Sequence, residues 1–349
     1  MTSKLRLGIL GCGAITRVAH LPAALSHPEV ELVALVDRDR EGAQSLAKSR
    51  SIGCHISSTT EFAAWELDAV INALPNSLHA ATTLQALEHG VHVLCEKPLA
   101  ISSSDAEACA AMADTCDRIL AVGMSRRFVG SHRVMHLLLQ ESVLGSSLGY
   151  SCSYGGEFDW KSASGFYFSK SLAGGGVLID FGVHLLDSLV DWFGPVTRLE
   201  YQDDNWGSGI EANAILEVEH SGRYGVVEGK LQLSRTFPLR NRLFITGTEA
   251  DAEISLADLD CVTVRRMIAG ERVKQTMRLE DYPHTSSFYK QLDNFVQSIR
   301  GNEKPVVDGW QAAEILHVIE SAYANAHRIP EPWAEVGSEI LIAATEVPA

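Results

Sequence analysis

The first 125 residues alternate between apolar, strand-like runs and segments with helical spacing, and this alternation narrows the possible folds more than any other feature. The strand-like runs are residues 5–10, 30–37, 69–74, 91–95 and 119–123, and the helical segments are residues 14–26, 41–50, 79–89 and 102–116. Strands that are apolar throughout and alternate with helices are typical of a parallel sheet covered on both faces. The sequence therefore predicts an α/β domain with a doubly wound parallel sheet over residues 1–125.

The pattern changes after this point. Strand-like segments follow at residues 149–158, 214–218, 224–233, 243–247 and 262–267, and helical segments at 133–142, 176–193 and 308–327. Successive strand-like segments with few helices among them are typical of a mixed or antiparallel sheet. We expect a second, α+β domain over residues 126–349, with a large open sheet and with the helix at 308–327 packed back on the core.

Composition excludes some partners. The formal net charge of −15 argues against nucleic acid and anionic membranes, which attract proteins rich in Lys and Arg. No apolar run approaches the roughly 18 residues of a membrane span, and the N-terminus does not read as a signal peptide. Seven scattered cysteines without a C-x-x-C pair suggest free thiols, so we expect a cytoplasmic protein.

A glycine-rich turn, GCGAIT, follows the first strand and opens a helix. Gly11 permits a tight turn, Gly13 lets the backbone approach a pyrophosphate, and the amides that open the helix, from Ala14 and Ile15 on, favour phosphates. The third glycine of the usual dinucleotide pattern is Thr16 here, so the turn alone could be an ordinary one.

An acidic residue strengthens this interpretation. Asp37 ends the second strand, 24 residues after Gly13. An acid at this place binds ribose hydroxyls and repels a 2′-phosphate, which favours NAD. Arg38 follows directly and could pair with a 2′-phosphate, so NADP stays open.

A charged turn, Glu96-Lys97-Pro98, ends the strand at residues 91–95. It lies at the carboxyl edge of the predicted sheet, where ligands bind in open α/β folds. Lys97 can therefore point into the crevice beside a nicotinamide, although a surface lysine in a charged loop is the commoner case.

The helix at residues 176–193 carries a narrow polar stripe made of Asp180, His184, Asp187 and Asp191, which fall within about 60° of one another at 100° per residue. Nearly all its other residues are apolar. Asp180 and His184 are four apart, so the carboxylate could orient the imidazole and support its action as a base. A thin solvent-facing edge is the alternative. A third metal ligand is not evident beside this pair, so we expect no metal.

Another pair at this spacing, His132 and His136, has no obvious acidic partner and is expected on a solvated helix face.

These pieces occur in one order that resembles the glucose-fructose oxidoreductase/inositol dehydrogenase/MocA (Gfo/Idh/MocA) family. The matching text is GILGCGAITRVAHLPAAL, the block at residues 73–100 with its EKP turn, VGMSRRF, and GGGVLIDFGVHLLD. The resemblance covers nearly the whole chain. It implies a Rossmann domain that binds NAD or NADP, and a second domain whose open sheet commonly forms homodimers or homotetramers.

The resemblance also implies roles for residues. Lys97 and Asp180 match substrate-binding positions, and His184 matches the catalytic acid/base. Other positions match residues that surround the cofactor, and these are Leu74 (where Thr or Ser is usual), Pro75, Asn76, His79, Glu96 and Arg127. Trp160, Phe166 and Tyr167 could line a sugar-stacking pocket, although filling the gap between sheet and helix is favoured for Phe166.

The expected activity is hydride transfer between a nicotinamide and a secondary alcohol or ketone of a sugar, cyclitol or sugar derivative. Two alternatives remain at this point. The chain could be a non-catalytic regulator that senses NAD(P), although such a sensor needs none of Lys97, Asp180 and His184. It could also be an oxidoreductase whose cofactor stays bound and is recycled between two sugars.

Overall fold

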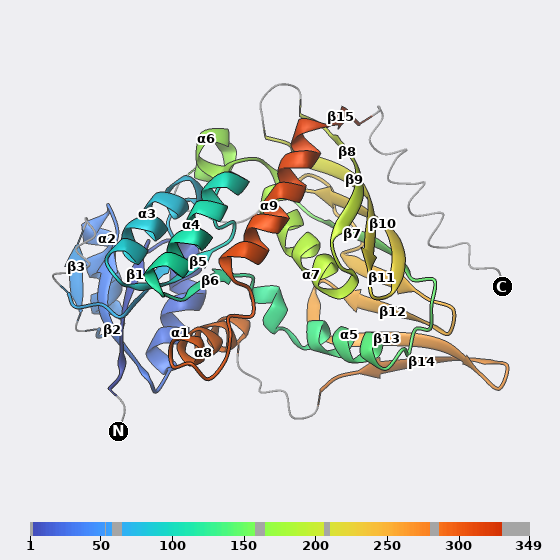
Figure 1. Ribbon diagram of the computed structural model, residues 1–349, viewed down its shortest axis with the longest axis horizontal. Helices are drawn as coiled ribbons and strands as arrows, with labels where there is room; N and C mark the ends of the chain where they lie inside the picture. Colours follow the sequence, from blue (N-terminus) through green and yellow to red (C-terminus); the bar gives the residue numbers. More distant parts are fainter. Residues whose placement is uncertain are drawn as a thin grey trace.

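The chain folds around two sheets that lie side by side (Figure 1). The computed structural model describes residues 3–52, 54–57, 65–157, 165–205, 210–279 and 286–329. The first sheet takes its strands from the N-terminal third of the chain, and the second sheet follows it. This arrangement confirms the expected fold class.

The first sheet has six strands, all paired in parallel, in the order β3-β2-β1-β4-β5-β6. They are β1 (Leu5–Leu10), β2 (Val30–Val36), β3 (His55–Ser57), β4 (Ala69–Asn72), β5 (His92–Glu96) and β6 (Leu120–Gly123). The chain runs outward from β1 in both directions, so a crevice opens between the carboxyl ends of β1 and β4. Only the short β3 was not predicted, because it has no apolar run.

Helices cover both faces of this sheet, and they are η1 (Thr16–His20), α1 (Leu21–Ser26), α2 (Arg40–Ser49), α3 (Asn76–Glu88) and α4 (Ser103–Cys116). The first predicted helix is two elements, because its opening turns are a π-helix, η1, that leads into α1. Side-chain caps begin two of the others, since Asp39 accepts from the Gly42 amide and Ser102 from the Asp105 amide.

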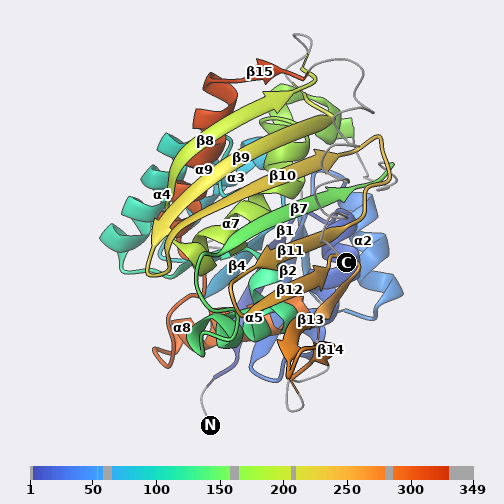
Figure 2. The same ribbon diagram turned by 90° about the vertical axis from the view of Figure 1, so that its right-hand side faces the viewer.

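The second sheet has nine strands in the order β14-β13-β12-β11-β7-β10-β9-β8-β15. They are β7 (Gly149–Gly155), β8 (Val196–Asp203), β9 (Asn213–Gly222), β10 (Gly225–Ser234), β11 (Arg242–Thr246), β12 (Ala250–Ser255), β13 (Asp258–Ile268), β14 (Glu271–Met277) and β15 (His327–Arg328). Two pairs, β10 with β7 and β15 with β8, are parallel, so the sheet is mixed. No described helix covers the face turned toward the viewer in Figure 2. Strand β14 was not predicted because its sequence, ERVKQTM, is mostly polar and exposed.

The remaining helices that the structure describes follow β6 in the chain, and several of them pack on the other face of the nine-stranded sheet. They are η2 (Ser125–Phe128), α5 (Gly130–Gln140), η3 (Gly165–Phe168), α6 (Lys170–Ala173), η4 (Leu178–Gly182), α7 (Val183–Phe193), α8 (Ser287–Ile299) and α9 (Gly309–Ala324). Helix α9 packs on α4 and α7, and α8, which was not predicted, packs on α1 (Figure 1). These two helices, which follow the second sheet in sequence, therefore return to the first domain.

One helical stretch, Lys170–Phe193, is long and apolar enough to span a membrane by composition alone. In the structure 78% of its most apolar window is buried inside the protein. The stretch lies behind the nine-stranded sheet (Figure 2), where its apolar residues pack into the core of the second domain. Its hydrophobicity is thus explained by burial in the fold.

Candidate active site

A cavity of about 920 Å³ runs from the glycine-rich turn to the η4–α7 helix. Both sheets contribute to its walls. The predicted site residues that line it are Gly11, Gly13, Ala14, Ile15, Asp37, Arg38, Leu74, Pro75, Asn76, His79, Glu96, Lys97, Tyr167, Asp180 and His184. Residues distant in sequence thus meet at one place. Trp160 lies outside the described residues, and Arg127 is not among the lining residues.

The glycine-rich turn has the backbone that its sequence predicts. Gly11 has φ +92°, and a Cβ there would lie 2.4 Å from the carbonyl oxygen of Ala73, so a larger residue would disrupt the turn. A Cβ on Gly13 would meet no protein atom within 4 Å, so the main chain is bare toward the cavity. Thr16 is fully buried and donates to the Gly11 carbonyl oxygen at 2.6 Å. The residue that departs from the glycine pattern therefore closes the turn.

Asp37 lies beside this turn at the end of β2. One of its carboxylate oxygens accepts from the Cys12 amide at 2.7 Å, and the other accepts from the Asp39 amide at 2.9 Å. Each oxygen keeps a lone pair for a ligand hydroxyl. Arg38 is exposed and lines the same end of the cavity. Together, the glycine-rich turn, Asp37 and Arg38 form a site that fits the adenosine half of a dinucleotide.

Two buried side chains hold the loops around the cavity together. Glu96 lies 2.7 Å from His20 Nε2, which joins the EKP turn to η1. Burial raises the pKa of Glu96, but its hydrogen bond with His20 and the nearby positive charges bring that pKa below its ordinary value. The ring nitrogens of His79 each lie 2.7 Å from a carbonyl oxygen, those of Pro98 and Leu74. The ring of His79 therefore links two loops at the wall of the cavity.

Lys97 reaches across the cavity from the first domain to the second. Its Nζ donates to Oδ1 and to the main-chain oxygen of Asp180, each at 2.9 Å. Arg235 on the end of β10 donates to Asp180 Oδ2, also at 2.9 Å, and its side chain is 5% exposed. Burial raises the pKa of Asp180, but Lys97 and Arg235 lower it below its ordinary value. Asp180 is thus an ionised carboxylate fixed between two cations.

His184 follows on the same helix with different surroundings. Its Nδ1 is buried and has no hydrogen-bond partner among the described residues. Burial lowers the pKa of His184 well below its ordinary value, and the positive charges of Lys97 and Arg126 add to this effect. The ring is therefore neutral near pH 7 and has a nitrogen free to take a proton.

The expected contact between Asp180 and His184 is wrong in its detail. Among the described residues Asp180 makes no hydrogen bond to His184, and its two oxygens accept from Lys97 and Arg235 instead. The reason is local: Asp180 lies in the π-helix η4, whose wider turn breaks the spacing of four that would stack the two side chains in an α-helix.

The rest of the polar stripe faces other partners and is not a solvent-facing edge. Asp187 is 1% exposed and accepts two hydrogen bonds from Arg127, at 2.6 and 3.0 Å. Asp191 contacts Arg127, His132 and His136. These contacts explain the orientation of Arg127, because they hold its guanidinium against α7 and away from the cavity. The neighbouring Arg126 lines the cavity in its place, 4.8 Å from the centre of the Tyr154 ring.

The contacts of Asp191 also correct the interpretation of the histidine pair. His132 is 5% exposed and not solvated, and Asp191 is the acidic partner that the sequence did not reveal. Nothing in the local sequence could show this, because 55 residues separate His136 from Asp191.

Aromatic side chains line the end of the cavity next to His184. Tyr167 and Phe166 are both half-buried there, with ring centres 4.0 Å apart, so Phe166 does more than fill the core. Burial raises the pKa of Tyr167, which keeps its hydroxyl protonated. The lining residues that were not singled out from sequence include Arg126, Tyr154, Phe181, Asn241 and Phe288. Tyr154, Asn241 and Phe288 lie in segments that carried no motif, whereas Arg126 and Phe181 lie inside the blocks VGMSRRF and GGGVLIDFGVHLLD, beside the residues that were singled out.

Family models match both domains. Residues 5–124 match the model described as the oxidoreductase family with an NAD-binding Rossmann fold, and residues 132–253 match the Gfo/Idh/MocA C-terminal domain.

Two curated proteins and one solved structure illustrate the similarity. D-glucoside 3-dehydrogenase of Escherichia coli is 31% identical over 93% of this chain and 96% of its own length. A putative UDP-kanosamine synthase oxidoreductase subunit of Amycolatopsis mediterranei is 32% identical, over 55% of this chain and 52% of its own. A levoglucosan dehydrogenase solved with NADH and levoglucosan has a TM-score of 0.81 at 18% identity, covering 93% of this chain and 98% of the other.

Proposed function

Because this chain belongs to the Gfo/Idh/MocA family of NAD(P)-dependent sugar oxidoreductases, we propose that it transfers a hydride at the secondary alcohol, or ketone, on carbon 3 of a glucose-type ring. One observation supports this activity above all. Lys97, Asp180 and His184 lie together at one end of the cavity, and the glycine-rich turn lies at the other. The choice of carbon 3 draws on the E. coli relative, which is named for that position.

The residues fit the cofactor on physical grounds. The bare main chain at Gly13 leaves room for a pyrophosphate, and Asp37 offers two carboxylate oxygens to ribose hydroxyls. When bound, the nicotinamide accepts or returns the hydride. The wall beyond Glu96 and Lys97 then belongs to the substrate.

The side chains divide the proton chemistry between them. In the oxidation direction, His184 is neutral and accepts the proton of the reacting hydroxyl. The Lys97 ammonium donates a hydrogen bond to the same oxygen and stabilises the negative charge that develops there. Asp180 holds Lys97 in position, since the two are bonded at 2.9 Å, and Arg235 fixes Asp180 in turn. The same groups act in reverse when a ketone is reduced.

Two substitutions test the activity. We expect His184→Ala and Lys97→Met each to lower kcat by about 10²–10⁴-fold, the usual contribution of a proton-transfer group, while NADH binding measured by fluorescence stays within about threefold. An Arg133→Gln variant is the matched control, because this exposed side chain lies on α5 and does not line the cavity. Near-normal kcat in both active-site variants would contradict the roles given to His184 and Lys97, and a lack of turnover by the unaltered chain that still binds NADH would favour the NAD(P) sensor.

Isotopic labelling tests the position of attack. Methyl β-glucoside carrying deuterium at carbon 3 should be oxidised several times more slowly than the unlabelled sugar under conditions where chemistry limits the rate. Deuterium at carbon 2 or carbon 4 should have no comparable effect, and the 3-deoxy sugar should not react. Turnover of the 3-deoxy sugar would contradict the proposal for carbon 3 while leaving the oxidoreductase activity intact.

The cofactor preference is expected to favour NAD. Asp37 is anchored beside the turn by the amides of Cys12 and Asp39, whereas Arg38 is exposed. A parallel fluorescence titration with NADH and NADPH measures the ratio. Tighter binding of NADPH would show that Arg38 decides the choice. Absorbance near 340 nm in the purified protein would instead indicate a cofactor that is retained and recycled.

We further propose that the chain forms a homodimer or homotetramer through the outer face of the nine-stranded sheet, and that it works in the cytoplasm. Large apolar side chains on its strands support an interface, since Val226 and Met267 are 57% and 58% exposed. All seven cysteines are free thiols, which fits a reducing compartment. Light scattering on the full chain measures the assembly, and a mass of one chain at micromolar concentration would exclude it.

A further inference from the structure

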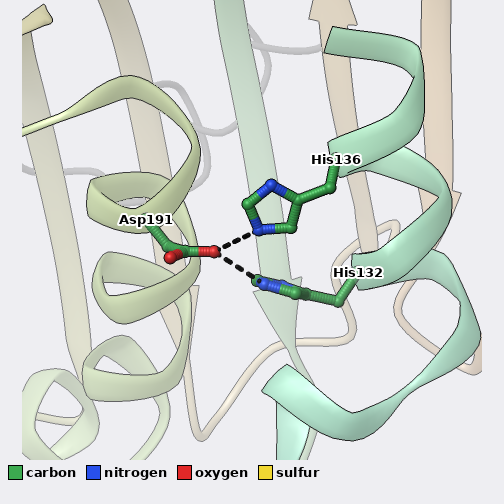
Figure 3. Close-up of side chains that lie close together, drawn as sticks. All are labelled: His132, His136 and Asp191. Carbon is green, nitrogen blue, oxygen red and sulfur yellow. Dashed lines mark hydrogen bonds and ion pairs between the residues drawn. The ribbon is translucent and has the colours of Figure 1, made fainter. Parts of the chain in front are cut away.

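His132 and His136 lie one turn apart on α5, and both rings point toward Asp191 on α7 (Figure 3). Oδ2 of Asp191 lies 2.9 Å from Nε2 of His132 and 2.5 Å from Nε2 of His136. These three potential ligand atoms all lie within 4.8 Å of one another. We propose that this His132–His136–Asp191 cluster binds a divalent transition metal ion of the zinc class, as a cross-link between α5 and α7.

The ligand types and their spacing suit such an ion. Zinc takes imidazole nitrogens and carboxylate oxygens at about 2.0–2.2 Å with tetrahedral geometry, which places neighbouring ligand atoms about 3.3–3.5 Å apart. The carboxylate oxygen therefore needs to move away from each ring nitrogen by up to about 1 Å, and the two ring nitrogens must come to a similar separation from each other. Two histidines four apart on a helix present their rings on one face, which is how a helix supplies two ligands to one metal.

The surrounding charges leave the carboxylate available. Arg127 contacts Oδ1 of Asp191, so it orients the group while Oδ2 faces the two rings. Asp187 matches the charge of Arg127 through two hydrogen bonds. The negative charge of Asp191 is therefore left over, and a bound cation would neutralise it. Partners that orient a ligating carboxylate in this way strengthen metal sites.

A metal would bind each ring in the tautomer that carries its proton on Nδ1. Metal binding requires an unprotonated Nε2, so each neutral ring must carry its proton on Nδ1. Nδ1 of His132 is buried and has no hydrogen-bond partner among the described residues. Bonds from Nε2 to the metal would replace the hydrogen bonds of the two rings to Asp191, and they must also offset a buried Nδ1–H on His132 that has no acceptor among the described residues.

The cluster is open to solvent on one side and separate from the cavity. The side chains of His136 and Asp191 are 30% and 22% exposed, which gives an ion and a fourth, water ligand access. None of the three residues lines the active-site cavity. Asp191 is seven residues beyond His184 on α7, about 10 Å along the axis. A metal here would tie down the helix that carries His184 without taking part in the reaction.

Binding of the metal alone tests the proposal. The full chain is freed of metal with a chelator, and Zn²⁺ is added in a calorimetric titration, with Co²⁺ as a spectroscopic probe. We expect one Zn²⁺ per chain, a visible absorption band typical of tetrahedral Co²⁺, and a rise in Tm with Zn²⁺. His136→Ala and Asp191→Asn should each weaken binding by at least about 100-fold, since each removes one of three protein ligands.

The matched control is His317→Ala, a histidine that is 53% exposed and paired with Glu107 elsewhere on the surface. It should bind Zn²⁺ like the unaltered chain. Circular dichroism establishes that each variant is folded, and His136→Ala is the safer of the two because its side chain is partly exposed. Lack of Zn²⁺ binding by the unaltered chain overturns the proposal. Binding that persists in His136→Ala and Asp191→Asn also overturns it, because the ion then lies elsewhere.

Discussion

The role of each residue in this site depends on the charged groups that contact it. Asp180 and His184 are close neighbours in sequence, yet one is ionised between Lys97 and Arg235 while the other is buried and neutral. Burial raises the pKa of Asp180 and lowers that of His184, and nearby cations bring both pKa values below their ordinary ones. Their different partners let the two groups take different roles, one fixing a cation and the other moving a proton. The ordinary pKa values of the two residue types already favour this division near pH 7, and the partners of each group extend it to lower pH.

The pH dependence of oxidation follows from His184. Its pKa is depressed, first by burial and then by Lys97 and Arg126, and only the neutral ring accepts a proton. Oxidation is therefore retained as the pH falls through the ordinary range of histidine, and it is lost only below the lowered pKa. We expect kcat at saturating substrate to stay level from about pH 8 to about pH 6.

The Arg126→Gln variant removes one of the charges that depress this pKa, so the acidic decline in kcat should move to higher pH. Arg133→Gln, an exposed arginine that does not line the cavity, should leave the decline in place. A decline of the unaltered enzyme centred near the ordinary histidine pKa would contradict the assignment of His184 as the base.

At the scale of elements, the start of the η4–α7 helix depends on one buried carboxylate. Glu211, 1% exposed, accepts from the amides of Gly176 and Leu178 at 2.9 and 2.8 Å, and from the Tyr323 hydroxyl at 2.9 Å. It satisfies amides that the first turn of a helix leaves unpaired. A Cβ on Gly176 would overlap the Glu211 main chain, so this close approach requires glycine. The cap thereby sets where Asp180 and His184 lie.

Glu211→Gln should lower the free energy of unfolding by about 2 kcal/mol. The amide group has one acceptor oxygen in place of two, and a hydrogen bond to a charged group contributes about 1.5–3 kcal/mol. Urea unfolding followed by circular dichroism measures the loss. The control is Glu217→Gln, because Glu217 is half exposed and pairs with Lys230 on the surface, where an ion pair contributes at most about 1 kcal/mol. Equal losses in the two variants would argue against the capping role.

At the scale of the whole molecule, one wall of the cavity is completed by a helix that returns to the first domain. Helix α8 lies after the second sheet in sequence but packs on α1, and its Phe288 lines the cavity and meets His20 edge-on. A ligand that contacts both domains binds the folded state alone. Its binding is therefore expected to stabilise the entire fold.

NADH at about 100 times its Kd should raise the free energy of unfolding by about 2.7 kcal/mol. Gly13→Val should abolish this gain and leave the ligand-free stability nearly unchanged, since a Cβ there meets no protein atom within 4 Å. Gly165→Val is the matched control, because Gly165 is equally open but does not line the cavity. Retention of the NADH effect in Gly13→Val would place the pyrophosphate elsewhere.

The sequence by itself determined the parallel sheet, the glycine turn with Asp37 after it, the EKP turn and the buried helix, because apolar periodicity and turn chemistry are local properties. Only the tertiary structure decided which side chains face one another. Arg235 reaches Asp180 from a strand 55 residues away, and Arg127 and the histidine pair meet Asp191 across two helices. Periodicity tells which face of a helix is polar, but the charge that meets that face comes from whichever distant element packs there.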